Sequence, residues 1–317
     1  MPSLLTHKIF SKEIFENLNK KDLIDPAALS AFSQSHDCLY FYQGIKGKEI
    51  HSLGKLAHRN NTQDFIYNVL SYIKENNLEN NKQIISFLYG ILSHYVLDST
   101  MHPYIYYKTG AYRKNNKDSK KYLGLHNKLE KYIDIYYYEK HFNKDIKKLN
   151  IKNEILVDFK LEKETAQLID YAYNKTYNYN NVSKYYFKGF KYTRILKSII
   201  SQDTKGYKKK ILGFFSKLFF KNYDFLANYS YYKNDDYKII ISDNNKWFHP
   251  CTNEEHTTTF DKLYEESKIN YLDIIKQVDE ILYNDKDIES IKEYIPNISY
   301  LTGIDCNSKL KLQHFEK

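Results

Sequence analysis

The sequence predicts an all-α fold, a multi-helix bundle around one buried central helix with a helical C-terminal extension. Three observations support this class. Apolar residues recur three and four positions apart through most of the chain, which is the period of a helix with one buried side. Only 10 glycines and 5 prolines interrupt the 317 residues. No segment shows the alternation of apolar and polar residues that indicates a half-buried strand.

Helix signals mark three elements in the first part of the chain. Thr6 stands where a capping residue is expected, and Ile9 and Phe10 follow it on the apolar side of a first helix. A short helix is predicted after Pro26, because proline is well suited to the first turn of a helix. Another helix is predicted to begin at Thr62.

The central helix is predicted over residues 82–101, which are apolar on nearly all sides, as is typical of a buried helix. Pro103 is expected to end it and to bias His102 away from helical geometry, because proline restricts the residue before it. The next helix is expected from Ser119 to Phe142. Later helices are expected at residues 162–175, 183–201, 206–228 and 258–283, with long polar loops at 107–118 and 230–256.

Cysteine use and hydropathy limit the cellular setting that we expect. The three cysteines are widely spaced and form no CxxC pair, which argues against a disulfide framework and fits a reducing compartment. The first residues hold no apolar stretch of signal-peptide length. No run of about 18 apolar residues predicts a transmembrane helix. We therefore expect a cytoplasmic protein, or one peripheral to the inner face of the membrane.

The basic residues are concentrated in residues 184–221, although the whole chain has a net charge of only +9. In this segment eleven lysines and arginines face the single acidic residue Asp203, and aromatic and aliphatic residues lie between them. Basic helices with an apolar side suit anionic membrane surfaces. The same composition could follow a nucleic-acid backbone, or belong to a packed helical hairpin with a solvated basic side. An anionic membrane surface is the partner that we place ahead of nucleic acid.

Two pairs of metal-ligand residues have helical spacing. His94 and Asp98 are four positions apart, as are His126 and Glu130. Four residues of α-helix turn the chain by roughly 400°, so the members of each pair lie on one side of their helix. Imidazole and carboxylate together suit Zn²⁺. A buried carboxylate such as that of Asp98 needs a metal or a polar partner, so a satisfied polar pair in the core is the alternative.

Further candidate ligands extend this pattern. His102 follows the first pair by four positions, His7 lies in the first turn of the first helix, and Asp37 follows an apolar helix. One more histidine comes from position 51 or 58. His51 has the better distance from Asp37, whereas His58 has the better flanking residues. We expect His58 to be the ligand.

The order His…Asp…His…HxxxDxxxH…HxxxE resembles that of the zinc-dependent phospholipase C family. That family shares its helical fold and trinuclear zinc site with a branch of single-strand-specific nucleases. The opening from Met1 to His7 and the stretch from Gly90 to Asp98 are similar to unsecreted bacterial members. The resemblance covers roughly residues 1–140 with specific motifs.

The resemblance implies three zinc sites and one catalytic carboxylate. Asp37, His58, His94 and Asp98 would hold one ion, His102, His126 and Glu130 a second, and His7 with a bridging Asp98 and the N-terminal amine and carbonyl a third. Asp37 would orient or deprotonate the attacking water. Two ions that share a carboxylate would stabilise in-line displacement at phosphorus.

We therefore expect a zinc-dependent phosphoric diester hydrolase with two or three zinc ions, which acts on a phospholipid and releases its phosphorylated headgroup. A nuclease-like phosphodiesterase of the same superfamily is one alternative, and a metal-stabilised protein without catalysis is another. An apolar entrance would favour lipid, whereas base-stacking aromatics along a groove would favour nucleic acid. We divide the chain into a zinc-binding core at residues 1–150 and a helical region at 151–317 packed on it.

Overall fold

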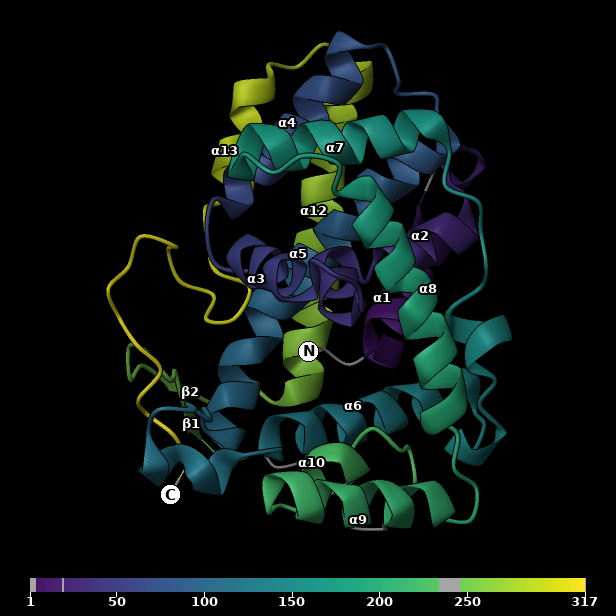
Figure 1. Ribbon diagram of the computed structural model, residues 1–317. Coiled ribbons are helices and arrows are strands. Elements are labelled where there is room, and N and C mark those ends of the chain that lie inside the picture. Colours follow the sequence, from purple (N-terminus) through teal and green to yellow (C-terminus); the bar gives the residue numbers. More distant parts are fainter. Residues whose placement is uncertain (1–3, 19, 234–245, 317) are drawn as a thin grey trace.

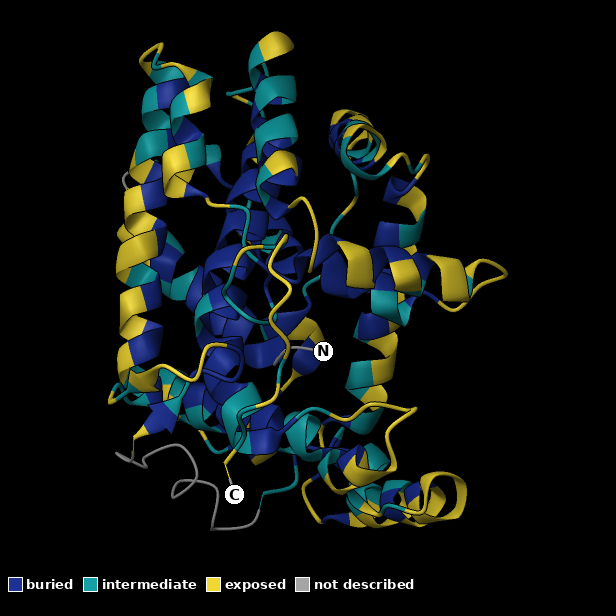
Figure 2. Ribbon diagram, turned by 90° about the vertical axis from the view of Figure 1, so that its left-hand side faces the viewer, coloured by how far each residue is buried: buried dark blue, intermediate teal, exposed yellow. Residues whose placement is uncertain are grey.

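The helices of the computed structural model surround the long helix α5 (Lys82–Thr109), which is buried along most of its length (Figure 1, Figure 2). The structure describes residues 4–18, 20–233 and 246–316. The other helices are α1 (Leu4–Asn17), α2 (Pro26–Phe32), α3 (Gly47–Ala57), α4 (Thr62–Glu75), α6 (Leu125–Phe142), α7 (Lys163–Tyr177), α8 (Ser183–Ile200), α9 (Tyr207–Phe220), α10 (Asp224–Ala227), α12 (Phe260–Tyr283) and α13 (Ile291–Tyr294). The predicted all-α class is confirmed. The division of the chain at residue 150 stays a prediction.

Helix α5 continues past Pro103 to Thr109, so the prediction that Pro103 ends it was wrong. A proline inside a helix leaves the carbonyl four residues earlier without its amide donor. That carbonyl belongs to Ser99, and Gly303 lies against it, where an added Cβ would be 2.6 Å from the Ser99 oxygen. The absence of a side chain at Gly303 therefore lets this segment pack on the interrupted turn. His102 lies within the continuous helix and shares one side of α5 with the candidate ligands before it.

The first turn of α1 is fixed to α6. Thr6 lies within α1 and does not cap it as predicted; its amide and its hydroxyl both donate to Asp134 Oδ1, at 2.8 Å and 2.9 Å. Asp134 belongs to α6, so a carboxylate from a second helix accepts a first-turn amide that has no partner inside α1. Burial raises the pKa of Asp134 even though these hydrogen bonds lower it. This contact fixes the position of the neighbouring candidate ligand, His7.

Glu13 joins three helices and gives a testable contribution to stability. Its carboxylate lies 3.0 Å from His141 Nδ1 of α6 and, on α12, 2.7 Å from Lys268 Nζ. Burial raises the pKa of Glu13, but the hydrogen bonds from His141 and Lys268 outweigh it and lower the pKa to about 2. Because this folded-state pKa is depressed, ionised Glu13 stabilises the fold above its unfolded pKa of about 4.3, and that contribution is lost as pH falls toward the folded value.

We expect Glu13→Gln to lower the free energy of unfolding by about 1–2 kcal/mol at neutral pH, and by progressively less as pH falls below about 4.3. Urea denaturation at several pH values measures the difference from wild type. Glu16→Gln, at an exposed position of the same helix, is the control and should change little. A Glu13→Gln deficit that stays constant down to the lowest pH would contradict this role.

Two predicted helices are shorter or divided because the backbone turns left-handed within them. The helix predicted over 119–142 begins only at Leu125, since Gly124 before it has φ of +84°. Glycine adopts this conformation without steric penalty. The helix predicted over 206–228 is broken at Lys221, where φ is +53°, into α9 and the short α10.

A two-stranded hairpin was not predicted. Strands β1 (Trp247–Phe248) and β2 (Glu255–His256) pair antiparallel, and two residues are too few to show an alternating pattern. Of the loop predicted at 230–256, residues 234–245 lie outside the described residues. The loop predicted at 107–118 starts later than expected, after the end of α5. Within the described ranges, no helix combines the length and hydropathy that a membrane-spanning segment needs.

Candidate metal centre

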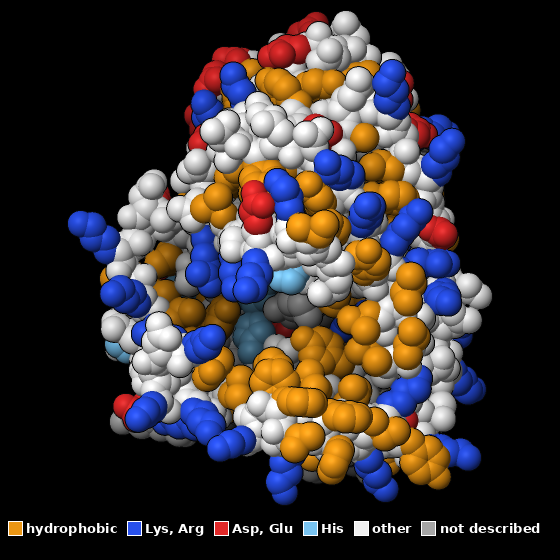
Figure 3. All heavy atoms as spheres, in the orientation of Figure 1, with side chains coloured by type: hydrophobic (Ala, Val, Ile, Leu, Met, Phe, Trp, Pro, Cys, Tyr) orange, Lys and Arg blue, Asp and Glu red, His pale blue; other side chains and the backbone are white. Residues whose placement is uncertain are grey.

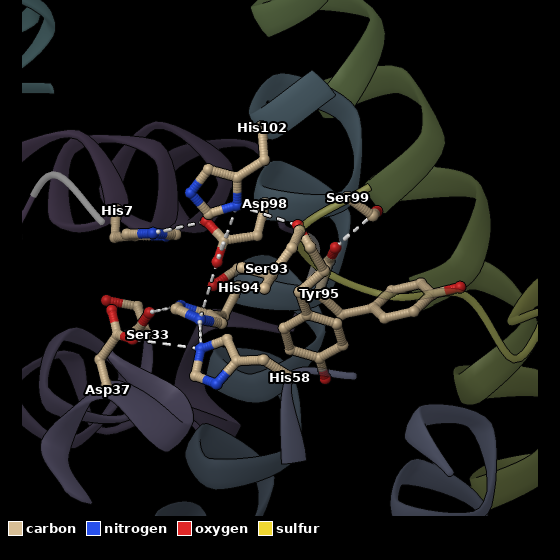
Figure 4. A network of polar contacts seen from close by, with 12 residues as sticks. His7, Ser33, Asp37, His58, Ser93, His94, Tyr95, Asp98, Ser99 and His102 are labelled. Atoms are coloured by element: carbon tan, nitrogen blue, oxygen red, sulfur yellow. Dashed lines mark hydrogen bonds and ion pairs between the residues drawn. The ribbon is translucent and has the colours of Figure 1, made fainter. Parts of the chain in front are cut away.

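The eight side chains predicted as metal ligands come together around α5, and Figure 4 shows six of them. Helix α5 contributes His94, Asp98 and His102, α6 contributes His126 and Glu130, α1 contributes His7, a 3₁₀ turn after α2 contributes Asp37, and His58 directly follows α3. All of them are buried except His126, which is partly exposed. Their ligand atoms form three groups, each compact enough for one ion.

The first group consists of Asp37, His58 and His94. His58 Nε2 lies 3.1 Å from Asp37 Oδ1 and 3.4 Å from His94 Nε2. His51, the alternative to His58, is directed elsewhere, because its Nε2 lies 2.8 Å from the carbonyl oxygen of Tyr42. Among the described residues, the groups of ligand atoms include His58 and not His51.

The second group consists of His7, His94 and Asp98, so His94 is common to the first two groups. Asp98 Oδ1 lies 3.1 Å from His7 Nε2, and Asp98 Oδ2 lies 3.2 Å from His94 Nε2. Asp98 thus groups with His7 and His94 but not with Asp37 and His58, and its role as a bridging carboxylate stays a prediction. The N-terminal amine and carbonyl predicted to complete this site lie outside the described residues.

The third group consists of His102, His126 and Glu130. Glu130 Oε1 lies 2.9 Å from His126 Nε2 and 3.5 Å from His102 Nε2. His102 also approaches the second group, since its Nδ1 is 3.6 Å from Asp98 Oδ2. The three groups therefore form one continuous cluster along one side of α5.

Backbone carbonyls fix the protonation of three histidine rings in the cluster. The Nδ1 atom of His58 lies 2.7 Å from the carbonyl oxygen of Gly54. That of His94 lies 3.0 Å from the carbonyl oxygen of Ser33, and that of His102 lies 2.9 Å from the carbonyl oxygen of Tyr300. Because a carbonyl oxygen only accepts, each neutral ring carries its hydrogen on Nδ1 and a lone pair on Nε2. The Nε2 atoms are those directed at the other ligands. Metal-binding histidines are oriented in this way by a partner of the second ring nitrogen.

Four carboxylate oxygens of the cluster are buried and accept no hydrogen bond: both of Asp37, Oδ2 of Asp98 and Oε1 of Glu130. The neutral rings of His58 and His94 direct an Nε2 lone pair, and not a hydrogen, at Asp37 and at Oδ2 of Asp98. The short distances therefore bring acceptors together, which is unfavourable in a buried site. A cation would satisfy both partners, and this set of imidazole and carboxylate ligands fits Zn²⁺.

The electrostatics of the cluster also favour a bound cation. Burial opposes ionisation of Asp98, but His102 and His94 outweigh it and hold the pKa of Asp98 well below its usual range. The pKa of Glu130 is likewise lowered by neighbouring histidines against the effect of burial. Burial lowers the pKa of His102, yet Asp98 and Glu130 raise it to about 9. The two carboxylates are therefore anionic at neutral pH and attract a proton or a metal ion.

Residues 6–179, more than half of the chain, match the sequence model of the family described as zinc dependent phospholipase C. The chain belongs to this family. All eight predicted ligands of this family member, from His7 to Glu130, lie within the matched residues. Comparisons with curated proteins and with solved structures gave no match. The family name and the ligand cluster together fit zinc, whereas the number of ions and the role of each ligand stay predictions.

The groups that orient the ligands of this phospholipase C family member were not found from the sequence. Three of these groups are the backbone carbonyls of Ser33, Gly54 and Tyr300, and a backbone carbonyl cannot be recognised from the residue type. Tyr300 is also far from the ligand motifs along the chain. Tyr40 also supports the site, since its ring stacks on His58 with centroids 5.4 Å apart. Its position three residues after Asp37 is the signal in the sequence that could have found it.

Two of the cavities that adjoin the cluster also reach basic residues beyond the predicted ligands. The larger one, of about 640 Å³, is lined by His126, Tyr106 and Arg59 among others. The smaller one is lined by Asp37, Glu130 and Lys197 of α8, so one lysine reaches the cluster from the basic segment. Figure 3 shows a hollow near the middle of this face, in which histidine and acidic side chains are visible. One edge of the cluster, at the partly exposed His126, thus borders the larger cavity.

Proposed function

We propose that the protein is a zinc-dependent phosphodiesterase that hydrolyses the headgroup phosphodiester of a phospholipid. The observation that carries this proposal is the continuous cluster of three ligand groups, in which buried carboxylate oxygens meet histidine lone pairs without a hydrogen between them. Membership of the zinc-dependent phospholipase C family gives the reaction class.

The roles of the residues follow from their positions. Bound zinc would supply positive charge to the phosphate and lower the pKa of an attacking water. Asp37, which faces the smaller cavity and has both oxygens free of hydrogen bonds, accepts the proton of that water. The other ligands would hold the zinc ions. Lys197 faces the same cavity as Asp37, and its ammonium group would bind a phosphate oxygen there.

A lipid substrate is favoured over a nucleic acid by the surface near the hollow. Apolar side chains lie below and beside the hollow in Figure 3. Helices α8 and α9 carry exposed aliphatic residues such as Ile195, Leu196 and Ile211. Aliphatic side chains can contact acyl chains, but they offer no ring on which a base could stack. The exposed aromatic residues beside them, such as Phe214 and Phe219, suit either partner. Hydrolysis would leave a diacylglycerol in the membrane and release the phosphorylated headgroup.

Metal content per chain is the first test. We expect about three zinc ions in the wild-type protein, one for each ligand group, and one fewer in His7→Ala, since His7 ligates only the second group. His51→Ala is the control and should keep the full content, because His51 stands outside the groups. Elemental analysis of protein purified without chelator gives the counts.

The other outcomes separate the alternatives. Zinc near zero would refute a zinc enzyme, and two ions unaffected by His7→Ala would show that the second group, which contains His7, holds no ion. The metal-loaded protein should then be assayed with a short-chain phosphatidylcholine and with single-stranded DNA. Turnover of DNA alone would favour the nuclease-like activity. Tight zinc binding without turnover of either substrate would show a metal-stabilised protein without catalysis.

A further inference from the structure

Helix α9 packs on the protein through its smallest residues. Gly213 and Ser216 are its buried residues. A Cβ at Gly213 would lie 2.1 Å from the ring of Tyr223, so the helix approaches the segment before α10 closely at this point. The Ser216 hydroxyl donates to the Asn222 carbonyl and accepts from the Leu226 amide. A short polar side of α9 therefore faces inward, which is the reverse of an ordinary amphipathic helix.

The large apolar residues of α9 consequently face solvent. Phe214, Leu218 and Phe219 are 65%, 63% and 69% exposed, and Tyr207 and Ile211 continue the same stripe at helical spacing. The packed hairpin considered from the sequence would bury these residues, so that interpretation is wrong for α9. Exposed apolar surface of this extent marks an interaction site.

Helix α8 presents a second stripe of the same kind. Tyr192, Ile195, Leu196 and Ile199 are exposed at spacings of three and four residues, while its other side is buried through residues such as Tyr186 and Phe190. Of the exposed large apolar side chains in the described residues, most lie on α8, on α9 or directly after α9. Figure 3 shows both stripes on the face that carries the hollow, over α8 and α9 as labelled in Figure 1.

Lysines border both stripes. On α9 and just after it, Lys210, Lys217 and Lys221 are exposed and recur at helical spacing beside the apolar side. On α8, Lys188 and Lys191 are exposed in the same way. Across residues 184–221 a single acidic residue opposes these charges, and the remainder of the chain is close to neutral. The apolar surface is therefore combined with a strong local positive charge.

We propose that the exposed apolar and basic side chains of α8 and α9, which we call the α8–α9 surface, dock on a lipid bilayer that contains anionic lipids. Phenyl and aliphatic groups would enter the boundary between headgroups and acyl chains, and the lysines would contact anionic headgroups. The hollow on the same face would then open toward the bilayer. This orientation rests on the proposed function, because it brings a membrane phospholipid to the metal cluster.

The composition of the α8–α9 surface favours lipid over the other kinds of partner. Protein interfaces are depleted of lysine relative to the rest of the surface, whereas here exposed lysines border both apolar stripes. A nucleic acid would be bound by charge and stacking, and neither requires the exposed Ile195, Leu196, Ile211 and Leu218. A bilayer with anionic headgroups matches both features at once.

Vesicle co-sedimentation tests this surface with the zinc-loaded full chain. Wild-type protein should bind vesicles made of equal parts phosphatidylcholine and phosphatidylglycerol, and bind vesicles of phosphatidylcholine alone much more weakly. The triple variant Phe214→Ser, Phe215→Ser and Phe219→Ser should lose roughly a hundredfold or more in vesicle affinity. The matched control, Ile269→Ser with Leu272→Ser on α12, also removes exposed apolar residues and should bind like wild type.

A charge variant tests the second component separately. Lys210→Gln with Lys217→Gln should weaken binding to the anionic vesicles by roughly tenfold or more. The control pair, Lys163→Gln with Lys276→Gln, removes the same charge from exposed positions elsewhere and should have little effect. Added salt should weaken wild-type binding more than it weakens binding of the Lys210 and Lys217 variant.

Several results would overturn the docking proposal. The proposal fails if wild-type protein does not bind anionic vesicles. It also fails if the phenylalanine variant and its α12 control lose vesicle affinity equally. A wild-type dimer that the phenylalanine changes convert to a monomer would assign the surface to a second copy of the chain. Hydrolysis of a short-chain phospholipid without vesicle binding would refute docking alone, whereas vesicle binding without hydrolysis of any lipid would refute the proposed function alone.

Discussion

Replacing Asp98 by Asn should remove zinc from the cluster and lower turnover of a phosphodiester by about a hundredfold or more. Asp98 has contacts on both oxygens, at 3.1 Å to His7 Nε2 and 3.2 Å to His94 Nε2, and a further approach of 3.6 Å from His102. Within the described residues, Asp98 thus lies near three candidate histidines, more than either of the other carboxylates of the cluster. An amide of the same shape lacks the negative charge, and its nitrogen offers hydrogens where a ligand lone pair is needed.

Elemental analysis and steady-state kinetics measure the effect of Asp98→Asn. Asp279→Asn is the matched control: Asp279 accepts a hydrogen bond from the Tyr89 hydroxyl at 2.6 Å and belongs to none of the ligand groups. This control should keep wild-type zinc and turnover. Wild-type zinc content in Asp98→Asn would refute the assignment of Asp98 as a bridging ligand.

The parts of this molecule that could be predicted from sequence are those in which spacing along one helix determines geometry. The four-residue steps from His94 to Asp98 and from His126 to Glu130 place each pair on one side of a helix, and the structure brings both pairs into the cluster. The apolar run of the central helix indicates burial for the same reason. Neither inference requires knowledge of the tertiary fold.

Features that depend on contacts between distant segments could not be predicted. Pro103 should end a helix by local rules, yet α5 continues to Thr109, and Gly303 from a distant segment lies against the interrupted turn. Thr6 has the composition of a cap, but its partner is Asp134 on another helix. His58 and His51 could not be separated by spacing alone, since the turn that follows α3 decides which ring reaches Asp37.

For the basic segment at residues 184–221, the composition was evident from the sequence, but the side of each helix that packs on the protein was not. Alternating lysines and apolar residues are compatible with a packed hairpin, a nucleic-acid surface or a membrane surface. What distinguishes them is which side of α9 faces the protein, and this depends on the close approach of Gly213 to Tyr223. A glycine at this place gives no local sign that the phenylalanines around it are exposed.

Replacing Asp37 by Asn should have a different effect from the change at Asp98: turnover should fall by about 10²–10⁴-fold, with a smaller loss of zinc. Asp37 lies at the edge of the cluster and faces the smaller cavity with Lys197, so it is placed to act on a water beside the substrate. Among the described residues, His58 is the one histidine in ion-pair contact with its carboxylate, at 3.1 Å. His58 and His94 would still offer two lone pairs to an ion in the first group.

The comparison of zinc content between Asp37→Asn and Asp98→Asn decides between two roles for Asp37. If Asp37 mainly takes the proton of the attacking water, its variant keeps most of its zinc and loses kcat with little change in the KM for a short-chain phospholipid. If it is chiefly a ligand, both variants lose zinc equally, and added zinc restores turnover in the Asp37 variant. Equal metal loss would thus contradict the catalytic assignment, because a missing proton acceptor cannot be replaced by saturating the site with metal.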